Sequence, residues 1–342
     1  MPHSTGASSI KFAAWLQRQW QGVTPWQVLL LPLALAFAVL SATRRLCYRV
    51  GLLRSYGMSV PVIVVGNLTV GGAGKTPLVL WLAEFLRSQG YRPGIISRGY
   101  GGRALRPQSV SGASDPALVG DEPVLLARRA QCPVWVGVRR VEVARALLAA
   151  RPDCDVLISD DGLQHYRLRR DAEIAVVDGE RRFGNALLLP AGPLREPRSR
   201  LASVDAVVVN DGAVAAGEYA MRLSGAIFRR LHNEETATAP DFAGKRLHAI
   251  AGIGHPQRFF AHLRKLGLTA IGHPFPDHHA FRPQDLQFDN ADAILMTEKD
   301  AVKCAAFASD NCWVLAVSAE VDAALGSRLL EKLRKHHGRQ TA

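Results

Sequence analysis

The 342-residue sequence contains few cysteines, and their arrangement argues against two kinds of cysteine-rich architecture. There are five cysteines, an odd number, and no two of them form a Cys-x-x-Cys pair. A disulfide framework or a structural zinc site would require paired, regularly spaced cysteines. We therefore expect free thiols and a reducing compartment such as the cytosol.

The sequence also lacks a nucleic-acid-binding motif, although the chain is strongly basic. Lys and Arg number 42 against 30 Asp and Glu, which gives a formal net charge of +12. Most positive residues are arginines spread along the chain, without a basic run or a ladder of aromatic residues. We expect an acidic membrane or a phosphorylated ligand as the partner, rather than nucleic acid, and no obligate protein partner is indicated.

Charged residues are absent from residues 28–42, an apolar run near the N-terminus. Trp20 and Trp26 precede this run, and four arginines follow it between residues 44 and 54. A signal peptide would carry its basic residues before the run, whereas these flanks are typical of a membrane interface with the basic end in the cytoplasm. We predict membrane attachment that either spans the bilayer or lies in one leaflet; the alternative is a helix in the protein core.

Short apolar runs alternate with helical patterns from residue 61 to residue 210. The expected strands cover 61–65, 93–97, 134–136, 155–159, 173–178 and 205–210, and the expected helices cover 77–90, 120–129 and 140–150. Such alternation predicts an α/β fold with a parallel sheet covered by helices on both faces. Ligands of such sheets bind beyond the carboxyl ends of the strands.

A polar, proline-containing segment at 233–242 predicts a boundary between two domains. Beyond it the pattern restarts, with a strand and glycine loop at 246–254, a helix at 257–267, and strands at 291–296 and 312–317. We therefore predict an N-terminal membrane-associated helical segment (1–58), a P-loop NTPase-like core (59–232) and a smaller α/β C-terminal domain (233–342).

The sequence Gly71-Gly-Ala-Gly-Lys-Thr76 lies between an expected strand and an expected helix. Glycines let backbone N–H groups approach phosphate oxygens, and the N-terminus of the following helix favours negative charge. In such a loop, Lys75 reaches the β- and γ-phosphates and Thr76 binds Mg²⁺. The predicted nucleotide-binding residues are Thr69, Val70, Gly71, Gly72, Ala73, Gly74, Lys75 and Thr76.

The loop departs from the pattern G-x-x-x-x-G-K-[ST] at its first position, where Thr69 replaces glycine. That position needs only a backbone turn, so threonine can be tolerated. The guanine-reading pattern [NT]-K-x-D is absent, because residues 297–300 have the wrong spacing. Membrane-bound nucleotide switches with a similar loop carry lysine where this chain has Val70. Both absences favour an ATP-using enzyme over a switch that recruits a partner.

Three further polar clusters follow strands or open helices. Asp160 and Asp161 follow an apolar strand, where an acid can hold Mg²⁺ directly or through water. Asp121 opens a helix, where the helix dipole alone would favour an acid. The cluster at 276–279 contains two histidines, either of which could help an aspartate to activate a hydroxyl. Spacing does not show which of these side chains meet.

Seven short motifs together resemble the signature of the tetraacyldisaccharide 4′-kinase family, the lipid A 4′-kinases of Gram-negative bacteria. In chain order they are GNLTVGGAGKTP, SRGYGG, GDEP, DDGLQH, GPLREP, PDHH and TEKD, which begin at Gly66, Ser97, Gly120, Asp160, Gly192, Pro276 and Thr297. They lie in the family's order and extend over most of the chain beyond residue 60. The apolar N-terminal segment is also similar to that family's membrane helix.

The resemblance implies an ATP- and Mg²⁺-dependent enzyme that phosphorylates the 4′-hydroxyl of tetraacyldisaccharide 1-phosphate. Such an enzyme would work at the cytoplasmic face of the inner membrane. Asp121 corresponds to the family's catalytic aspartate, and its partner histidine is placed at His278, with His279 as the rival. The remaining implied residues are Lys75 in catalysis, Asp160 and Asp161 as metal-site acids and Glu196 as a further active-site acid, grouped with them at the metal. Which acid contacts the metal directly stays open.

Overall fold

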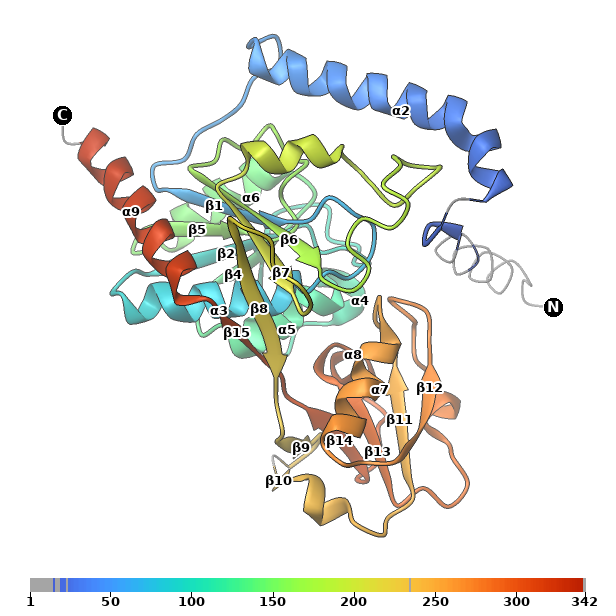
Figure 1. The fold of residues 1–342 in the computed structure, drawn as a ribbon. Helices are drawn as coiled ribbons and strands as arrows, with labels where there is room; N and C mark the ends of the chain where they lie inside the picture. The colour runs from blue at the N-terminus through green and yellow to red at the C-terminus, as the bar shows by residue number, and fades with distance from the viewer. Residues whose placement is uncertain (1–14, 16–18, 23, 234, 341–342) are drawn as a thin grey trace.

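The computed structural model describes residues 15, 19–22, 24–233 and 235–340, with side chains up to residue 334. Parts of the predicted N-terminal segment 1–58, and residues 341–342 of the predicted C-terminal domain, lie outside the described residues. Figure 1 shows a larger α/β unit, a smaller one beside it, and a long helix, α2, along the outside of the larger unit.

The larger unit is built on a nine-stranded sheet with the order β15-β8-β7-β6-β1-β5-β2-β4-β3. All neighbouring strands in it are parallel except the two edge strands, β3 and β15, which are antiparallel to their neighbours. The strands are β1 (Val62–Gly66), β2 (Pro93–Ser97), β3 (Gln108–Val110), β4 (Val134–Val136), β5 (Val156–Ser159), β6 (Ala172–Asp178), β7 (Ala206–Asn210), β8 (Glu218–Ser224) and β15 (Ser318–Val321). The predicted parallel sheet is confirmed.

Helices cover both faces of this sheet, which explains why its inner strands are continuous apolar runs. One core cluster joins the sheet to α3, α5 and α9, and a second joins it to α6. Every residue of β1, β2, β5 and β6 is buried. The helices of this unit are α3 (Lys75–Ser88), α4 (Pro116–Val119), α5 (Asp121–Arg129), α6 (Arg140–Ala150) and α9 (Ala323–Gln340), with a 3-10 helix at Arg198–Ser203.

The smaller unit has a six-stranded sheet with the order β10-β9-β14-β13-β11-β12. Its four strands β11–β14 are parallel, and β9 and β10 are antiparallel additions at one edge. Its elements are β9 (Phe228–Arg230), β10 (Thr236–Ala237), β11 (Leu247–Ala251), α7 (Pro256–Lys265), β12 (Ala270–Pro274), β13 (Ala293–Thr297), α8 (Glu298–Cys304) and β14 (Cys312–Leu315), with 3-10 helices at Ala239–Phe242 and Pro283–Leu286.

The chain passes between the two units twice, which differs from the single boundary predicted at 232/233. Strand β9 already belongs to the smaller sheet, and β15 returns to pair with β8 of the larger sheet. Leu325, Leu329 and Leu333 of α9 are buried in the core of the larger unit. Residues 318–333 therefore pack with the larger unit, because their apolar face completes its core.

Helix α2 (Pro25–Arg49) contains the predicted apolar run and extends beyond it at both ends. Its mean hydropathy is 1.9 over the most apolar window, and only 11% of that window is buried. Leu29, Leu33 and Leu40 are 68%, 59% and 71% exposed. The alternative of a core helix is therefore wrong, and α2 is long and apolar enough to enter a membrane.

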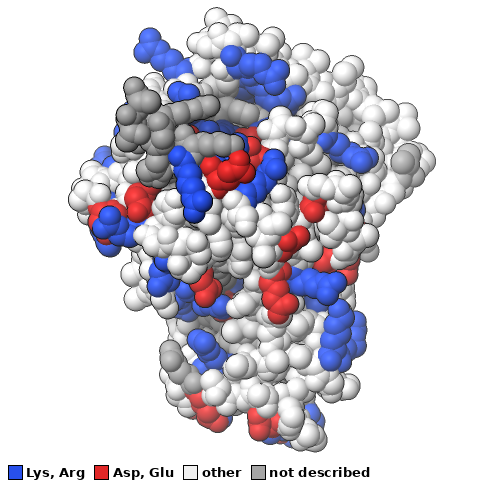
Figure 2. All heavy atoms as spheres, turned by 60° about the vertical axis from the view of Figure 1, so that its left-hand side comes forward, with Lys and Arg blue, Asp and Glu red and all other residues white. Residues whose placement is uncertain are grey.

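Basic side chains are not gathered into one patch on the face shown in Figure 2. They are distributed over that face, with acidic side chains between them. This agrees with the spread of arginines along the sequence, and it does not resemble the continuous basic stripe of a nucleic-acid-binding surface.

Candidate functional site

The glycine-rich loop joins β1 to α3, and glycine is required at two of its positions. Gly71 and Gly74 have φ values of +97° and +95°, a backbone conformation that is unfavourable for residues with a Cβ atom. A Cβ at Gly74 would also lie 2.3 Å from Asn210 Nδ2, which donates a hydrogen bond to the Ala73 carbonyl at 3.1 Å. Because α3 begins at Lys75, the positive end of its dipole lies at this loop. The loop therefore favours an anion.

Thr69 stands at the first loop position because the backbone there is held by another segment. It forms an isolated antiparallel bridge with Leu194, and the neighbouring Val70 N–H donates to the Pro193 carbonyl at 2.8 Å. An extended backbone of this kind accommodates any side chain. The departure from the expected glycine thus has a structural reason.

Lys75 and Arg195 lie on either side of the Asp161 carboxylate, which follows β5. Lys75 Nζ is 3.5 Å from Asp161 Oδ1, and Arg195 Nη1 is 3.3 Å from Asp161 Oδ2. Both cations also donate to Asn67 Oδ1, at 3.2 and 2.7 Å. Burial alone would raise the pKa of Asp161, but the charges of Lys75 and Arg195 outweigh it and lower that pKa to about 2. Asp161 is therefore ionised at neutral pH.

Asp160 lies beside Asp161 and is almost fully buried. Its Oδ1 has no hydrogen-bond partner within the part of the chain that the structure describes, and its Oδ2 lies 3.5 Å from the Ser97 hydroxyl. Burial and the charge of Glu122 raise the pKa of Asp160 to about 7. An unpartnered buried carboxylate next to an ionised one fits a divalent cation, which would stabilise both charges. Thr76, half-buried in the first turn of α3, offers a hydroxyl of the type that joins such a site.

Asp121 and His278 meet although they come from different units. Asp121 is the first residue of α5, His278 follows β12, and His278 Nδ1 lies 3.3 Å from Asp121 Oδ2. Burial raises the pKa of Asp121, but the contact with His278 and the charge of Lys299 outweigh it and hold that pKa below its usual value. Burial lowers the pKa of His278, but Asp121 outweighs it and holds that pKa above its usual value. Asp121 is therefore ionised near neutral pH, and its contact favours the charged form of His278.

His279 faces in another direction, within the smaller unit. Its Nε2 lies 2.9 Å from Asp285 Oδ2, and its ring packs against Phe275 and Phe281. Of the two neighbouring histidines, His278 is thus the one that contacts Asp121. The choice between them could not be made from spacing.

Lys299 is a site residue that the sequence analysis did not select. Its Nζ donates to Glu122 Oε1 at 3.0 Å and to Asp277 Oδ1 at 3.1 Å, and it lies 3.9 Å from Asp121 Oδ2. These carboxylates outweigh burial and raise the pKa of Lys299, so it stays charged. The available signal was the motif Thr297-Glu-Lys-Asp300. Its spacing does not fit the guanine-reading pattern, but it is one of the seven motifs of the family resemblance.

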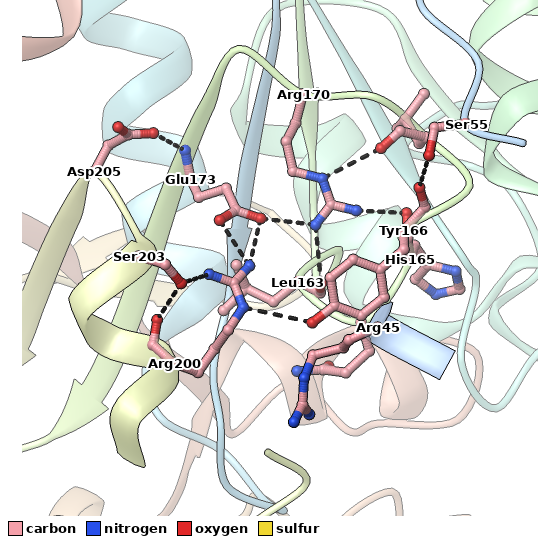
Figure 3. A network of polar contacts seen from close by, with 12 residues as sticks. Arg45, Ser55, Leu163, His165, Tyr166, Arg170, Glu173, Arg200, Ser203 and Asp205 are labelled. Atoms are coloured by element: carbon pink, nitrogen blue, oxygen red, sulfur yellow. Dashed lines mark hydrogen bonds and ion pairs between the residues drawn. The ribbon is translucent and has the colours of Figure 1, made fainter. Parts of the chain in front are cut away.

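Glu196 is buried, and the protein itself occupies both of its carboxylate oxygens. Oε2 accepts a hydrogen bond from Gln164 at 3.0 Å, and Oε1 accepts one from the Tyr166 hydroxyl. Arg45 of α2 lies 3.6 Å from Oε1. Figure 3 shows Tyr166 hydrogen-bonded in turn to Arg200, with Arg45 nearby. In this arrangement Glu196 connects α2 to the loop after β5.

The glycine-rich loop also touches the smaller unit through an arginine. Arg181 Nη2 donates to the Gly72 carbonyl at 2.6 Å, and its Nη1 donates to the Gly254 carbonyl at 3.3 Å. Asp178 holds this guanidinium at 2.9 Å and also pairs with Arg258 of α7 at 3.1 Å. The two units therefore meet both at the loop and at the Asp121–His278 pair.

Two relatives of known name cover nearly the whole chain. The tetraacyldisaccharide 4′-kinase of Methylobacillus flagellatus is 54% identical over 325 residues, which cover 95% of this chain and 97% of that protein. The protein of the same name from Nitrosococcus oceani is 52% identical over 325 residues, which cover 95% of this chain and 96% of that protein.

A solved structure has the same fold. LpxK from Aquifex aeolicus, crystallised in complex with ATP, matches with a TM-score of 0.77 and 27% sequence identity, over 90% of this chain and 99% of that one. The family model described as tetraacyldisaccharide-1-P 4′-kinase matches residues 26–334. The chain belongs to the tetraacyldisaccharide-1-P 4′-kinase family.

Proposed function

We propose that this chain transfers a phosphoryl group from ATP to the 4′-hydroxyl of a tetraacyldisaccharide 1-phosphate, in the biosynthesis of lipid A. The observation that carries the proposal is the contact of Asp121 with His278 at 3.3 Å, in a protein where Arg181 joins the glycine-rich loop to the smaller unit. Phosphoryl transfer depends mainly on positioning and on charge stabilisation, and this site supplies both.

The nucleotide phosphates bind at the glycine-rich loop. Backbone N–H groups of residues 71–76 and the Lys75 ammonium contact their oxygens, in the manner of a P-loop. Thr76, Asp160 and Asp161 would hold Mg²⁺, which would neutralise negative charge on the phosphates. The unpartnered Oδ1 of Asp160 supports this assignment. Glu196 acts through Gln164, which also donates to the Asn67 carbonyl at 3.2 Å, rather than as a direct metal ligand.

Asp121 is the general base. Its lowered pKa keeps the carboxylate ready to accept the proton of the 4′-hydroxyl as that oxygen attacks phosphorus. His278 holds the carboxylate in place through its Nδ1. Proton transfer by a positioned side chain contributes about 10²–10⁴-fold to a rate. Lys299 fixes the neighbouring Glu122 and Asp277, so the base and its histidine keep one arrangement.

The enzyme works at the cytoplasmic face of the bacterial inner membrane, where α2 provides the anchor. The exposed leucines of α2 suit the hydrocarbon region, and Arg44, Arg45 and Arg49 suit the anionic surface. The partners are the glycolipid substrate and the membrane surface, with no nucleic acid and no obligate protein partner.

The rival is a membrane-bound nucleotide switch, and the dependence of turnover on glycolipid separates the two. The intact chain in neutral detergent would be given ATP and Mg²⁺, with and without the disaccharide lipid. The kinase proposal expects ATP consumption that rises with added lipid and saturates. Equal ATP hydrolysis with and without lipid would contradict it.

A further inference from the structure

The C-terminal turns of α2 pack against Tyr166, which lies in the loop that follows β5. The Tyr48 and Tyr166 rings have centres 5.8 Å apart, and the Arg44 guanidinium lies 5.9 Å from the centre of the Tyr166 ring. Only 11% of the most apolar window of α2 is buried, by contrast. The basic end of the helix is therefore docked on the larger unit.

Arg45 lies on the docked side of α2, and its charge faces Glu196. Arg45 Nη1 is 3.6 Å from Glu196 Oε1, and Glu196 is only 2% exposed. The same Nη1 is buried and makes no hydrogen bond to any residue that the structure describes. A charged group without a hydrogen bond is costly to bury unless an opposite charge lies beside it. Arg45 therefore depends on Glu196, and this pair differs from exposed ion pairs, which contribute little.

Glu196 is a branching point, because other side chains contact both of its oxygens. The Tyr166 hydroxyl donates to Oε1, Gln164 Nε2 donates to Oε2 at 3.0 Å, and Arg200 Nε lies 4.0 Å from Oε2. Burial and the charge of Glu196 raise the pKa of Tyr166 to about 12, so the phenol keeps the proton that it donates. Figure 3 shows the hydrogen bond from Arg200 to Tyr166. If Arg45 is lost, Arg200 still attracts the carboxylate, on the side where Gln164 binds.

Gln164 connects Glu196 to the backbone before the glycine-rich loop. Its Nε2 also donates to the Asn67 carbonyl at 3.2 Å, and its Oε1 accepts from Arg195 Nη1 at 3.2 Å. Asn67 is fully buried, and its Oδ1 accepts from Lys75 Nζ at 3.2 Å and from Arg195 Nη2 at 2.7 Å. The contacts form one continuous path from the membrane helix to the loop, through Arg45, Glu196, Gln164, Asn67 and Lys75.

We propose that Arg45 is a positioning residue for the glycine-rich loop and acts through Glu196 and Gln164. Lys75 is then held in its place for phosphate only when the basic end of α2 is docked on the larger unit. Coupling of this kind travels through contiguous hydrogen-bonded and charged side chains, and changes along such a network alter a remote affinity by about 2- to 30-fold. The inference rests on the proposed function in one respect, which is the assignment of this loop as the nucleotide site.

The test measures the affinity of the intact chain for ATP with Mg²⁺, by calorimetric titration in neutral micelles. Arg45→Gln removes the charge that faces Glu196, and Arg45→Lys keeps it. Gln164→Ala interrupts the path in its middle, and it is made alone and together with Arg45→Gln. Arg54→Gln is the matched control, because it removes one positive charge from an exposed position just beyond α2.

Arg45→Gln is expected to weaken ATP binding about 2- to 30-fold, and Arg45→Lys should recover most of that loss. Gln164→Ala should also weaken binding, and adding Arg45→Gln to it should change little, because the path is already broken. The control should bind ATP as the unchanged chain does. A purely structural role of Arg45 would act independently of Gln164, so the two losses would then multiply.

Equal affinities of Arg45→Gln and Arg54→Gln for ATP would overturn the inference, and so would losses from Arg45→Gln and Gln164→Ala that multiply. A loss that Arg45→Lys does not recover would also overturn it, because the charge would then not be the cause. Absence of ATP binding by the unchanged chain would overturn the proposed function and this inference together. Normal ATP binding by that chain without phosphate transfer to the lipid would contradict the kinase proposal alone.

Discussion

His278 Nδ1 lies 3.3 Å from Asp121 Oδ2, and this contact joins the smaller unit to the first turn of α5 in the larger one. Neither residue has this partner unless the two units are together. The proposed base is therefore complete only when the two units are arranged as they are in this structure. Lys299, from the smaller unit, strengthens that arrangement through Glu122 of the larger unit.

Asp121 and His278 are predicted to act as one catalytic unit. Asp121→Ala and His278→Ala should each lower kcat by about 10²–10⁴-fold with little change in the KM for ATP, because proton transfer rather than nucleotide binding is lost. The double variant should be little slower than the slower single variant. Steady-state kinetics of the three variants measures this. Losses that multiply would mean that the two residues have separate tasks.

His279→Ala is the matched control for this pair. His279 is the neighbouring residue but contacts Asp285 instead of Asp121, so its loss should leave the non-additivity of the other two variants unchanged. A severe loss of kcat from His279→Ala, with none from His278→Ala, would show that His279 rather than His278 is the partner of the base.

Lys299 is predicted to be a positioning residue whose charge also sets the working pH range. Lys299→Met should lower kcat by about 10–10²-fold, because the base loses its fixed place. The charge of Lys299 lowers the pKa of Asp121, so its removal should move the acid limb of the kcat/KM profile to higher pH. Lys265→Met, at an exposed position on α7, is the control. A fall in kcat with an unmoved pH profile would indicate a purely structural role.

The His278 contact is predicted to stabilise the fold only below a limiting pH. The folded-state pKa of His278 is raised above 6.5, so its stabilising contribution is complete below that value and is lost as the pH rises through the raised pKa. The thermal midpoint of the intact chain should therefore exceed that of His278→Gln most clearly at about pH 6 and least at about pH 9. A difference that grows toward alkaline pH would contradict the ion pair.

The exposed apolar face of α2 is predicted to hold the protein at the membrane. Replacing Leu29, Leu33 and Leu40 with Gln should move protein from the membrane to the soluble fraction, because each buried leucine contributes about 1.5–3 kcal/mol. Leu105→Gln with Leu118→Gln, exposed leucines away from α2, should not. Deleting residues 1–42 should act in the same direction. Unchanged pelleting of both changed forms with membranes would exclude α2 as the anchor.

The inner strands could be predicted from sequence because both of their faces are buried. The expected strands at 61–65, 93–97 and 155–159 correspond to β1, β2 and β5, which read as unbroken apolar runs. Strands β3, β8, β9, β10, β12 and β15 were not predicted. Each of them has at most one buried residue, so their sequences carry no such run. The return of the chain to the larger sheet was missed for the same reason.

The residues of the candidate site could be predicted individually, but the contacts between them could not. Parallel strands bring their carboxyl ends to one edge, which accounts for Lys75 lying beside Asp161. The contact between Asp121 and His278 depends on how two units pack, and local sequence does not encode that. The family resemblance supplied the pairing, and Lys299 was overlooked because its partners come from two segments that lie far from it in the sequence.

Phosphate transfer followed by mass spectrometry tests the central claim most directly. The intact chain, ATP and Mg²⁺ would be incubated with purified tetraacyldisaccharide 1-phosphate, and the lipid product would be fragmented to locate any added phosphate. The account predicts one added phosphate on the 4′-oxygen, and a transfer rate about 10²–10³-fold lower for Lys75→Ala, which loses a charge-stabilising contact. No added phosphate, or wild-type transfer by Lys75→Ala, would contradict it.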